Sequence, residues 1–201
     1  MGNRYSEIVF TPSVRRIQEA KGSRRAYARF EGGPHSNAEL GEDEMQFIAS
    51  RDSFYIASTG ETGWPYVQHR GGPAGFLKVL DSRSIGFSDF RGNRQFVSFG
   101  NIAADDRVAL ILMDYPHRAR LKLLGHARTI TAEESDLLAR LGTPTHRSRP
   151  EGGMFIRVAA FDWNCPQYIT PRYTEEEMGG HVSDLKARIA DLEGQIKRAS
   201  K

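Results

Sequence analysis

The sequence of 201 residues predicts a mainly β (α+β) protein, an antiparallel barrel of about six strands with short helices over its ends. Three observations predict this class. Strand-like segments follow one another closely along the chain, and glycine-rich turns separate several of them. The alternating strand–helix units of a doubly wound parallel sheet are missing. Apolar residues make up 39% of the chain and charged residues 26%, which is typical of a globular protein.

The chain divides into three parts in this interpretation. Residues 1–40 form a peripheral N-terminal extension, because glycines interrupt the helices that could start there. Residues 41–173 form the barrel domain, which opens with a helix whose first turn, at residues 42–44, is acidic and therefore favourable for the helix dipole. Composition and alternation predict strands over residues 53–58, 65–70, 84–90, 108–113, 120–130 and 154–163.

Two further helices are expected inside the barrel domain. One covers residues 93–101, where Phe96 and Phe99 lie three apart. The other follows Thr131, which forms a capping box with Glu134. Both helices are short, as expected for segments that cover the ends of a barrel.

The C-terminal segment 174–201 carries apolar residues at alternating spacings of three and four: Val182, Leu185, Ile189, Leu192 and Ile196. This spacing predicts an amphipathic helix with charged residues around a single apolar stripe. The stripe is shorter than the three to four heptads, roughly, that define a coiled coil. Two interpretations stay open: the helix packs on its own subunit, or it forms a dimer contact.

Bulk properties exclude several classes of protein. Cys165 is the single cysteine, so an intrachain disulfide and a thiolate metal cluster are excluded. No apolar run approaches the ~20 residues of a membrane helix, and residues 1–7 lack the apolar core of a signal peptide. We therefore expect a cytoplasmic protein. The net charge of +3 is scattered among 25 acidic residues, so nucleic acid is not the expected partner.

Arginines follow two of the expected strands. The strand 65–70 ends in Arg70 beside two glycines, and the strand 84–90 runs into Arg91 and Arg94. A guanidinium donates two parallel hydrogen bonds to an oxyanion, and glycine lets a ligand approach the backbone closely. Arg94 also opens the expected helix, whose N-terminal amides favour an anion, and Gln95 adds an amide donor. The pattern predicts a phosphate-bearing ligand where two neighbouring strands end, with Arg91 as the alternative to Arg94.

Other polar residues near these strand ends are weaker candidates. Ser88 and Asp89 could bond a heterocycle or ribityl hydroxyls, although ordinary strand-end capping is the better explanation from the residues alone. His69 could act as a general base. No metal-ligand spacing, no nucleophile motif and neither of the common glycine-rich nucleotide motifs is present, so we predict no metal and name no catalytic residue.

The chain resembles the pyridoxamine 5'-phosphate oxidase-related FMN-binding proteins over about residues 40–173. The resemblance rests on the order of these segments: Phe47–Ala57, Gly63–Gly72, Asp89–Gln95, Asp106–Leu110 and Trp163–Gln167. It implies a six-stranded split β-barrel and a homodimer with FMN at the subunit interface.

The resemblance also implies which residues touch the flavin. The strand residues Tyr66, Val67, Gln68 and His69 would line it, while Arg70, Arg94 and Gln95 would meet the phosphate, with Ser88 and Asp89 nearby. The C-terminal region of the second subunit would add Trp163, Asn164 and Gln167.

The sequence departs from the pyridoxamine phosphate oxidases themselves. Their substrate-binding C-terminal segment is replaced here by an acidic linker and the helical stripe. Arg70 replaces a lysine of the family, and Gln95 replaces the lysine of an Arg-Lys pair. The resemblance therefore implies an FMN-dependent oxidoreductase of unknown substrate, with a small molecule or a nicotinamide as its redox partner. The alternatives are a flavin-binding sensor or carrier without turnover and, more weakly, a nucleic-acid or heme-binding module.

Overall fold

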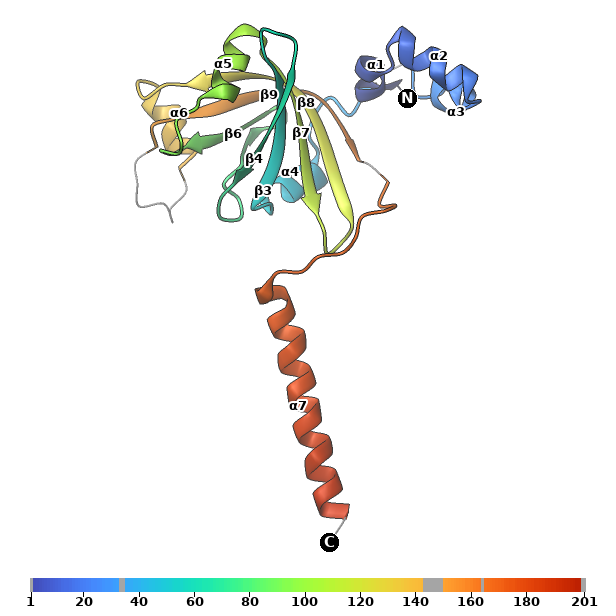
Figure 1. Cartoon of the computed structure of the whole chain (residues 1–201), viewed down its shortest axis with the longest axis vertical. Coiled ribbons are helices and arrows are strands. Elements are labelled where there is room, and N and C mark those ends of the chain that lie inside the picture. The colour runs from blue at the N-terminus through green and yellow to red at the C-terminus, as the bar shows by residue number, and fades with distance from the viewer. Residues whose placement is uncertain (1, 33–34, 143–149, 164, 200–201) are drawn as a thin grey trace. The chain divides into compact units, whose positions relative to one another are not determined.

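The computed structural model of the chain describes residues 2–32, 35–142, 150–163 and 165–199 (Figure 1). Two compact units make up the chain. The first comprises Met1–Met113 and Arg120–Cys165, and the second comprises Asp114–Ala119 and Pro166–Lys201. No helix in the described ranges is both long enough and apolar enough to cross a membrane.

The described residues form nine strands: β1 (Gly2–Asn3), β2 (His35–Ser36), β3 (Ser53–Thr59), β4 (Pro65–Gly71), β5 (Lys78–Asp81), β6 (Ser84–Asp89), β7 (Arg107–Asp114), β8 (Ala119–Ile130) and β9 (Gly152–Trp163). The first two pair as a small parallel sheet. The other seven form one sheet in the order β4-β3-β7-β8-β9-β6-β5, antiparallel at the pairs β3–β4, β3–β7, β5–β6, β6–β9 and β8–β9. The predicted class is confirmed, but six strands were expected and the sheet has seven. The additional strand is β5, which has only four residues.

The helices are α1 (Arg4–Val9), α2 (Pro12–Ala20), α3 (Arg24–Ala28), α4 (Glu42–Ala49), α5 (Val97–Ala104), α6 (Ser135–Arg140) and α7 (Glu175–Ala199). The sequence predicted α5 over residues 93–101, and the structure corrects its start to Val97. Arg94 and Phe96 have positive φ angles of 59° and 52°, a backbone conformation that a right-handed helix cannot include. Arg94 therefore lies in the loop before α5 and does not open the helix.

Helix α4 starts where the acidic residues predicted it. The Glu44 carboxylate accepts a hydrogen bond from the Gly41 backbone N–H at 2.9 Å, which caps the first turn. The same carboxylate accepts a 2.5 Å bond from the indole N–H of Trp163, at the end of β9. The Trp163 ring also packs edge-on against Phe47, with the ring centroids 4.8 Å apart. These contacts fix α4 to the end of β9.

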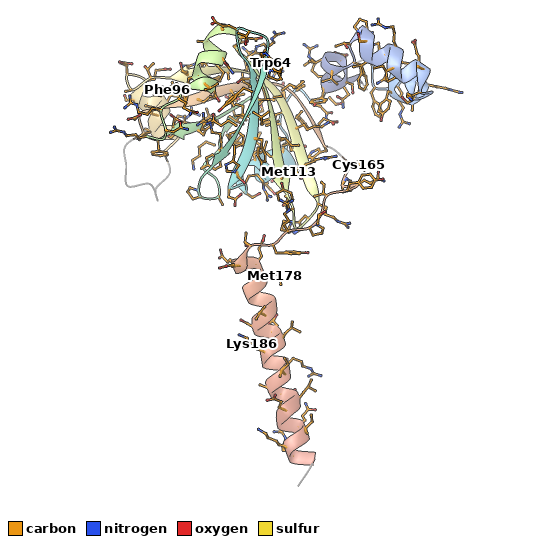
Figure 2. All side chains as sticks on the ribbon, viewed as in Figure 1. Trp64, Phe96, Met113, Cys165, Met178 and Lys186 are labelled. Atoms are coloured by element: carbon orange, nitrogen blue, oxygen red, sulfur yellow. The ribbon has the colours of Figure 1, made fainter. Side chains whose placement is uncertain are left out.

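An aromatic core lies inside the curled sheet. Phe54 of β3 packs against Phe76 at a centroid distance of 5.7 Å and against Phe87 of β6 at 5.5 Å. All three side chains are buried. On the outside, the turn between β3 and β4 presents Trp64, which is 78% exposed (Figure 2).

The curl of the sheet brings the ends of β4 and β6 together. Strand β4 lies at one edge of the sheet, and β6 lies one strand from the other edge. Even so, Arg70 near the end of β4 and Asp89 at the end of β6 form an ion pair, with Nη1 and Oδ1 3.1 Å apart. From the sequence, the two strands were expected to be neighbours. The structure corrects this point, because the strands are separated in the sheet and meet only at their ends.

Candidate functional site

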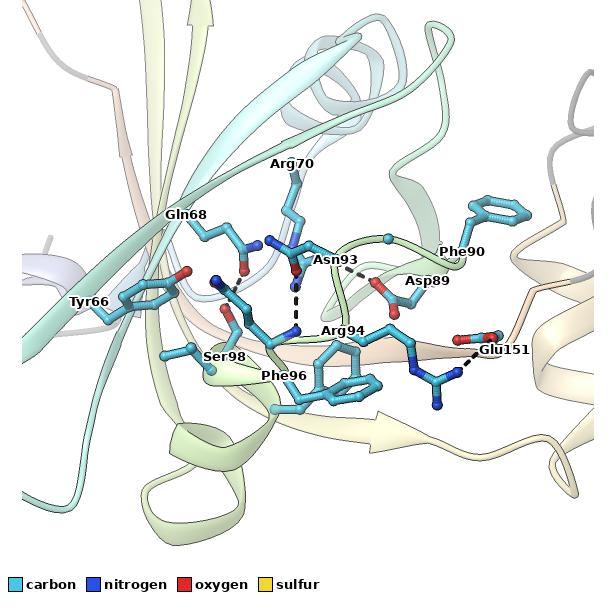
Figure 3. Close-up of a pocket in the computed structure, with 14 residues that line it drawn as sticks. Tyr66, Gln68, Arg70, Asp89, Phe90, Asn93, Arg94, Phe96, Ser98 and Glu151 are labelled. Carbon is cyan, nitrogen blue, oxygen red and sulfur yellow. Dashed lines mark hydrogen bonds and ion pairs between the residues drawn. The ribbon is translucent and has the colours of Figure 1, made fainter.

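A cavity of about 270 Å³ opens where the ends of β4 and β6 meet the loop before α5 (Figure 3). Alternate residues of β4 form one wall, the loop after Asp89 forms another, and the first turn of α5 closes a third. Glu151, just before β9, completes the lining. A second cavity of about 280 Å³ shares Arg70, Asp89 and Phe90 with the first.

The alternation of β4 divides the five residues predicted to lie along the ligand. Tyr66, Gln68 and Arg70 are half-buried and line the first cavity. Val67 and His69 are exposed, as expected for the opposite face of a strand. The His69 ring packs edge-on against Tyr55 of β3 and lines the second cavity. The structure therefore brings three of the five side chains into the first cavity.

The Arg70 guanidinium lies close to two aromatic rings. Its guanidinium carbon lies 5.5 Å from the Phe87 ring centroid and 5.8 Å from that of Phe99, and its side chain is only 16% exposed. One of its terminal nitrogens donates to Asp89. Its buried Nε has no hydrogen-bond partner among the residues that the structure describes. An unpaired buried donor is costly, so this atom is suited to binding a ligand acceptor.

Asp89 competes with an anionic ligand for the Arg70 guanidinium. Burial raises the pKa of its carboxyl above the ordinary value, and the adjacent Arg70 guanidinium opposes this rise. The negative charge of Glu151 adds to the increase in the Asp89 pKa. Asp89 therefore takes up a proton more readily than an exposed aspartate, and protonation would release Arg70 for another anion.

Arg94 and Gln95 lie in the loop between β6 and α5. The Arg94 side chain is 54% exposed, and its guanidinium is 3.9 Å from the Glu151 carboxylate. The Gln95 backbone N–H donates to the Asn93 side chain at 3.2 Å. Both residues line the first cavity, whereas Arg91 is exposed and lies outside the described lining. Of the two alternatives, Arg94 is thus the arginine at the cavity.

The start of α5 also faces the cavity. Its N-cap residue, Phe96, makes no side-chain capping bond to the helix amides. The hydroxyl of the buried Ser98 donates to the Gln68 side chain at 2.7 Å and so ties the first turn of α5 to β4. Free amides at a helix N-terminus carry a partial positive charge and favour an anion. The predicted helix terminus is therefore present at the cavity, four residues later than expected.

The other predicted site residues lie elsewhere in the chain. Ser88 is buried, donates to the Leu141 carbonyl at 3.1 Å and lines the second cavity. Trp163 packs on α4, as described above, and Gln167 is exposed in the second unit. Asn164 lies outside the described residues.

Several residues of the cavity were missed by sequence reasoning. Asn93 and Ser98 are polar and close in sequence to Arg94, so their position alone could have identified them. Phe99 was assigned only to a helix face. Glu151 lies more than fifty residues after the loop that it faces, and only the β6–β9 pairing brings it to the cavity. Nothing in the sequence indicated its role.

The arrangement suits an anionic ligand, with a restriction. Two arginines and two carboxylates line the first cavity, so its formal charge is balanced. A phosphate would find the unpaired Nε of Arg70, the half-exposed guanidinium of Arg94 and the amides at the start of α5. The phosphate would have to displace the Asp89 carboxylate from Arg70, or bind when that carboxyl is protonated. The donors therefore fit a phosphate monoester, and the carboxylates limit how tightly it binds.

Comparisons with known proteins agree with this architecture. The family described as pyridoxamine 5'-phosphate oxidase matches residues 40–154. No curated protein matches the chain. A solved structure of a proposed pyridoxamine 5'-phosphate oxidase from Lactobacillus delbrueckii is 17% identical with a TM-score of 0.50, and the match covers 63% of this chain and 96% of that one.

Two further solved structures are more distant. HupZ from Group A Streptococcus is 11% identical with a TM-score of 0.49, over 67% of this chain and 99% of that one. HutZ, a heme storage protein from Vibrio cholerae, is 13% identical with a TM-score of 0.43, over 61% and 93%. The family match extends over more than half of the 201 residues and includes the strands, the loop and the helix that build the cavity. The chain belongs to the pyridoxamine 5'-phosphate oxidase family.

Proposed function

We propose that the protein binds FMN and acts as an oxidoreductase on a small molecule. The observation that carries this proposal is the buried guanidinium of Arg70, oriented by two rings and left with an unpaired Nε at the meeting point of two strand ends. A phosphate monoester is the ligand group that such a donor set fits best. The chain belongs to a family named for an oxidase, and this supports a flavin as the molecule that bears the phosphate.

The residues present fit FMN at its phosphate end. Arg70 would donate through Nε, Arg94 through its exposed guanidinium, and Gln95 through its side-chain amide. The first amides of α5 would add their partial positive charge. The ring system would then extend along β4, where Tyr66, Val67, Gln68 and His69 offer either side chains or backbone.

The protein's own residues bind and orient the cofactor in this proposal. FMN, when bound, supplies hydride exchange at its N5 atom. The bond between Ser98 and Gln68 ties two walls of the cavity together, and the rings of Phe87 and Phe99 lie close to the Arg70 guanidinium. Asp89 is the titratable group closest to the phosphate donors, and its position suits control of binding better than proton transfer to a substrate. We assign no catalytic acid or base.

We further propose a homodimer in which a second subunit completes the flavin site through its C-terminal region, at Trp163, Asn164 and Gln167. Trp163 is 39% exposed although it already contacts α4, so part of its ring is available to a ligand or a partner.

Two steps test the proposal. The first is titration of ligand-free protein with FMN and with riboflavin, which lacks the phosphate. Tighter binding of FMN supports the phosphate site, and equal affinity contradicts it. The second is anaerobic mixing of the FMN-loaded protein with NADH or NADPH, followed by candidate electron acceptors. Bleaching of the flavin by a donor and its recovery with an acceptor support an oxidoreductase. FMN binding without reduction by any donor would identify a carrier or sensor instead, and a heme spectrum would identify the weaker alternative.

A further inference from the structure

Helix α7 exposes a continuous apolar stripe over most of its length. The stripe consists of Met178, Val182, Leu185, Ile189, Leu192 and Ile196, whose exposed fractions lie between 40% and 65%. An ordinary protein surface exposes large apolar side chains singly, whereas this 25-residue helix exposes six on one face. The stripe therefore requires an account of what covers it.

The residue types along the stripe are specific to one kind of assembly. The spacing of four and three places Val182, Ile189 and Ile196 at the a positions of a heptad repeat. It places Met178, Leu185 and Leu192 at the d positions. Among parallel coiled coils, branched residues at a with leucine at d favour two strands, because their side chains fit the two kinds of layer in that geometry. The stripe thus favours a single partner helix.

The charges beside the stripe agree with a parallel pair. Arg188 occupies a g position and Glu193 the following e position. In a parallel, in-register pair these two positions of opposite chains lie next to each other, so each helix would offer one attractive contact to the other. Within a single helix Arg188 reaches only the exposed Asp191, at 3.3 Å.

The glycines of α7 avoid the stripe. Gly179, Gly180 and Gly194 fall at e and f positions, on the outer side of the repeat. Each makes an isolated helix less stable than alanine would at the same position. Helical stability in such a segment comes from burial of the apolar face rather than from intrinsic propensity. The partner that buries the face is therefore part of what keeps the segment helical.

We propose that α7 pairs with α7 of a second copy of this chain as a parallel, in-register, two-stranded coiled coil. The pairing is independent of the flavin proposal, because it uses no residue of the cavity. It joins two subunits through their C-terminal segments whether or not a ligand is bound.

Cysteine cross-linking in the full chain tests the direction and register of the pair. Cys165 is exposed and is first replaced by serine. Leu185→Cys and Leu192→Cys are then made separately in this background. A disulfide forms only where two Cα atoms approach within about 7 Å. In a parallel, in-register pair each cysteine faces its own copy, so both variants should form disulfide-linked dimers under mild oxidation. Ala187→Cys, at an outer f position, should react roughly tenfold more slowly or not at all, because it lacks the high effective concentration of the buried layer.

Further variants separate a specific pair from chance collisions. Adding Ile189→Asp to the Leu185→Cys chain should abolish its cross-link, whereas Asp191→Asn, on the outer face, should leave it unchanged. Flavin binding should be the same in all these chains, so a failed cross-link does not bear on the proposed function. The proposal is overturned if Leu185→Cys and Leu192→Cys react no faster than Ala187→Cys. It is also overturned if the two cysteines link only to each other in a mixture, because a parallel, in-register pair keeps them seven residues, or about 10 Å, apart along the helix axis.

Discussion

Replacing Arg70 with methionine removes one positive charge from the cavity and keeps a long side chain between the rings of Phe87 and Phe99. A methionine sulfur packs favourably against aromatic rings, so the local packing should survive. The change takes away the donor that lies deepest in the cavity, with only 16% of its side chain exposed. It also leaves Asp89 without the partner that favours its charged form.

The expected loss of affinity follows from the hydrogen bonds that the guanidinium offers. A hydrogen bond to a charged group contributes about 1.5–3 kcal/mol, so losing one such bond should weaken FMN binding roughly 10- to 150-fold. The unpaired Asp89 should also lower the free energy of unfolding by about 1–3 kcal/mol. The double variant Arg70→Met/Asp89→Asn has no unpaired charge at this point, and it should recover most of the stability but not the affinity.

Quenching of flavin fluorescence during titration of ligand-free protein measures the effect. Riboflavin is the matched ligand, since it lacks the phosphate, and Arg91→Met is the matched protein variant, since Arg91 lies outside the lining. Arg70→Met should weaken FMN binding and leave riboflavin binding and Arg91→Met close to wild type. The reasoning is refuted if Arg70→Met binds FMN within twofold of wild type, or if it weakens riboflavin equally.

Three further predictions follow from individual contacts. Asp89→Asn frees Arg70 and should tighten FMN binding by about 1 kcal/mol, or roughly fivefold, in the same titration. This gain should shrink as the pH falls, because the raised pKa of Asp89 means that the wild-type carboxyl takes up a proton at a higher pH than an ordinary aspartate. Gly125→Ala would place a methyl group 2.7 Å from the Arg157 carbonyl oxygen in β9, so chemical denaturation should show a loss of about 1–3 kcal/mol. The hydrogen bond from Arg107 lowers the pKa of Asp105 to about 2. The ionised Asp105 carboxylate therefore stabilises the fold above pH 3.8, and this stabilisation is lost as the pH falls through about 2. The thermal unfolding temperature of Asp105→Asn should depend less on pH over that interval than that of the wild type.

The architecture could be predicted because its signals are local. Six of the seven strands of the main sheet show alternation or a continuous apolar run, and glycine-rich turns mark several of their ends. Strand β5 was missed because four residues, Lys78–Asp81, are too few to show a period of two. The start of α5 was misplaced because an arginine and a phenylalanine with positive φ angles carry no sequence mark, whereas glycine would have.

The donors of the site and one acceptor, Asp89, were candidates from the sequence, whereas Glu151 and the pairing of Arg70 with Asp89 were not foreseen. Arg70 and Arg94 follow strands beside glycines, a local pattern. The carboxylates that face them, Asp89 and Glu151, depend on the curl of the sheet and on the pairing of β6 with β9. The pattern of exposure along β4 could have been read from strand alternation alone, which would have separated Val67 and His69 from the three side chains in the cavity.

The most direct test of the account compares the dissociation constants of FMN and riboflavin for the wild-type protein. The account predicts that the phosphate strengthens binding, and that removing Arg70 abolishes most of the difference between the two ligands. Equal affinity of the wild-type protein for FMN and riboflavin would contradict the central claim that this cavity holds a flavin by its phosphate.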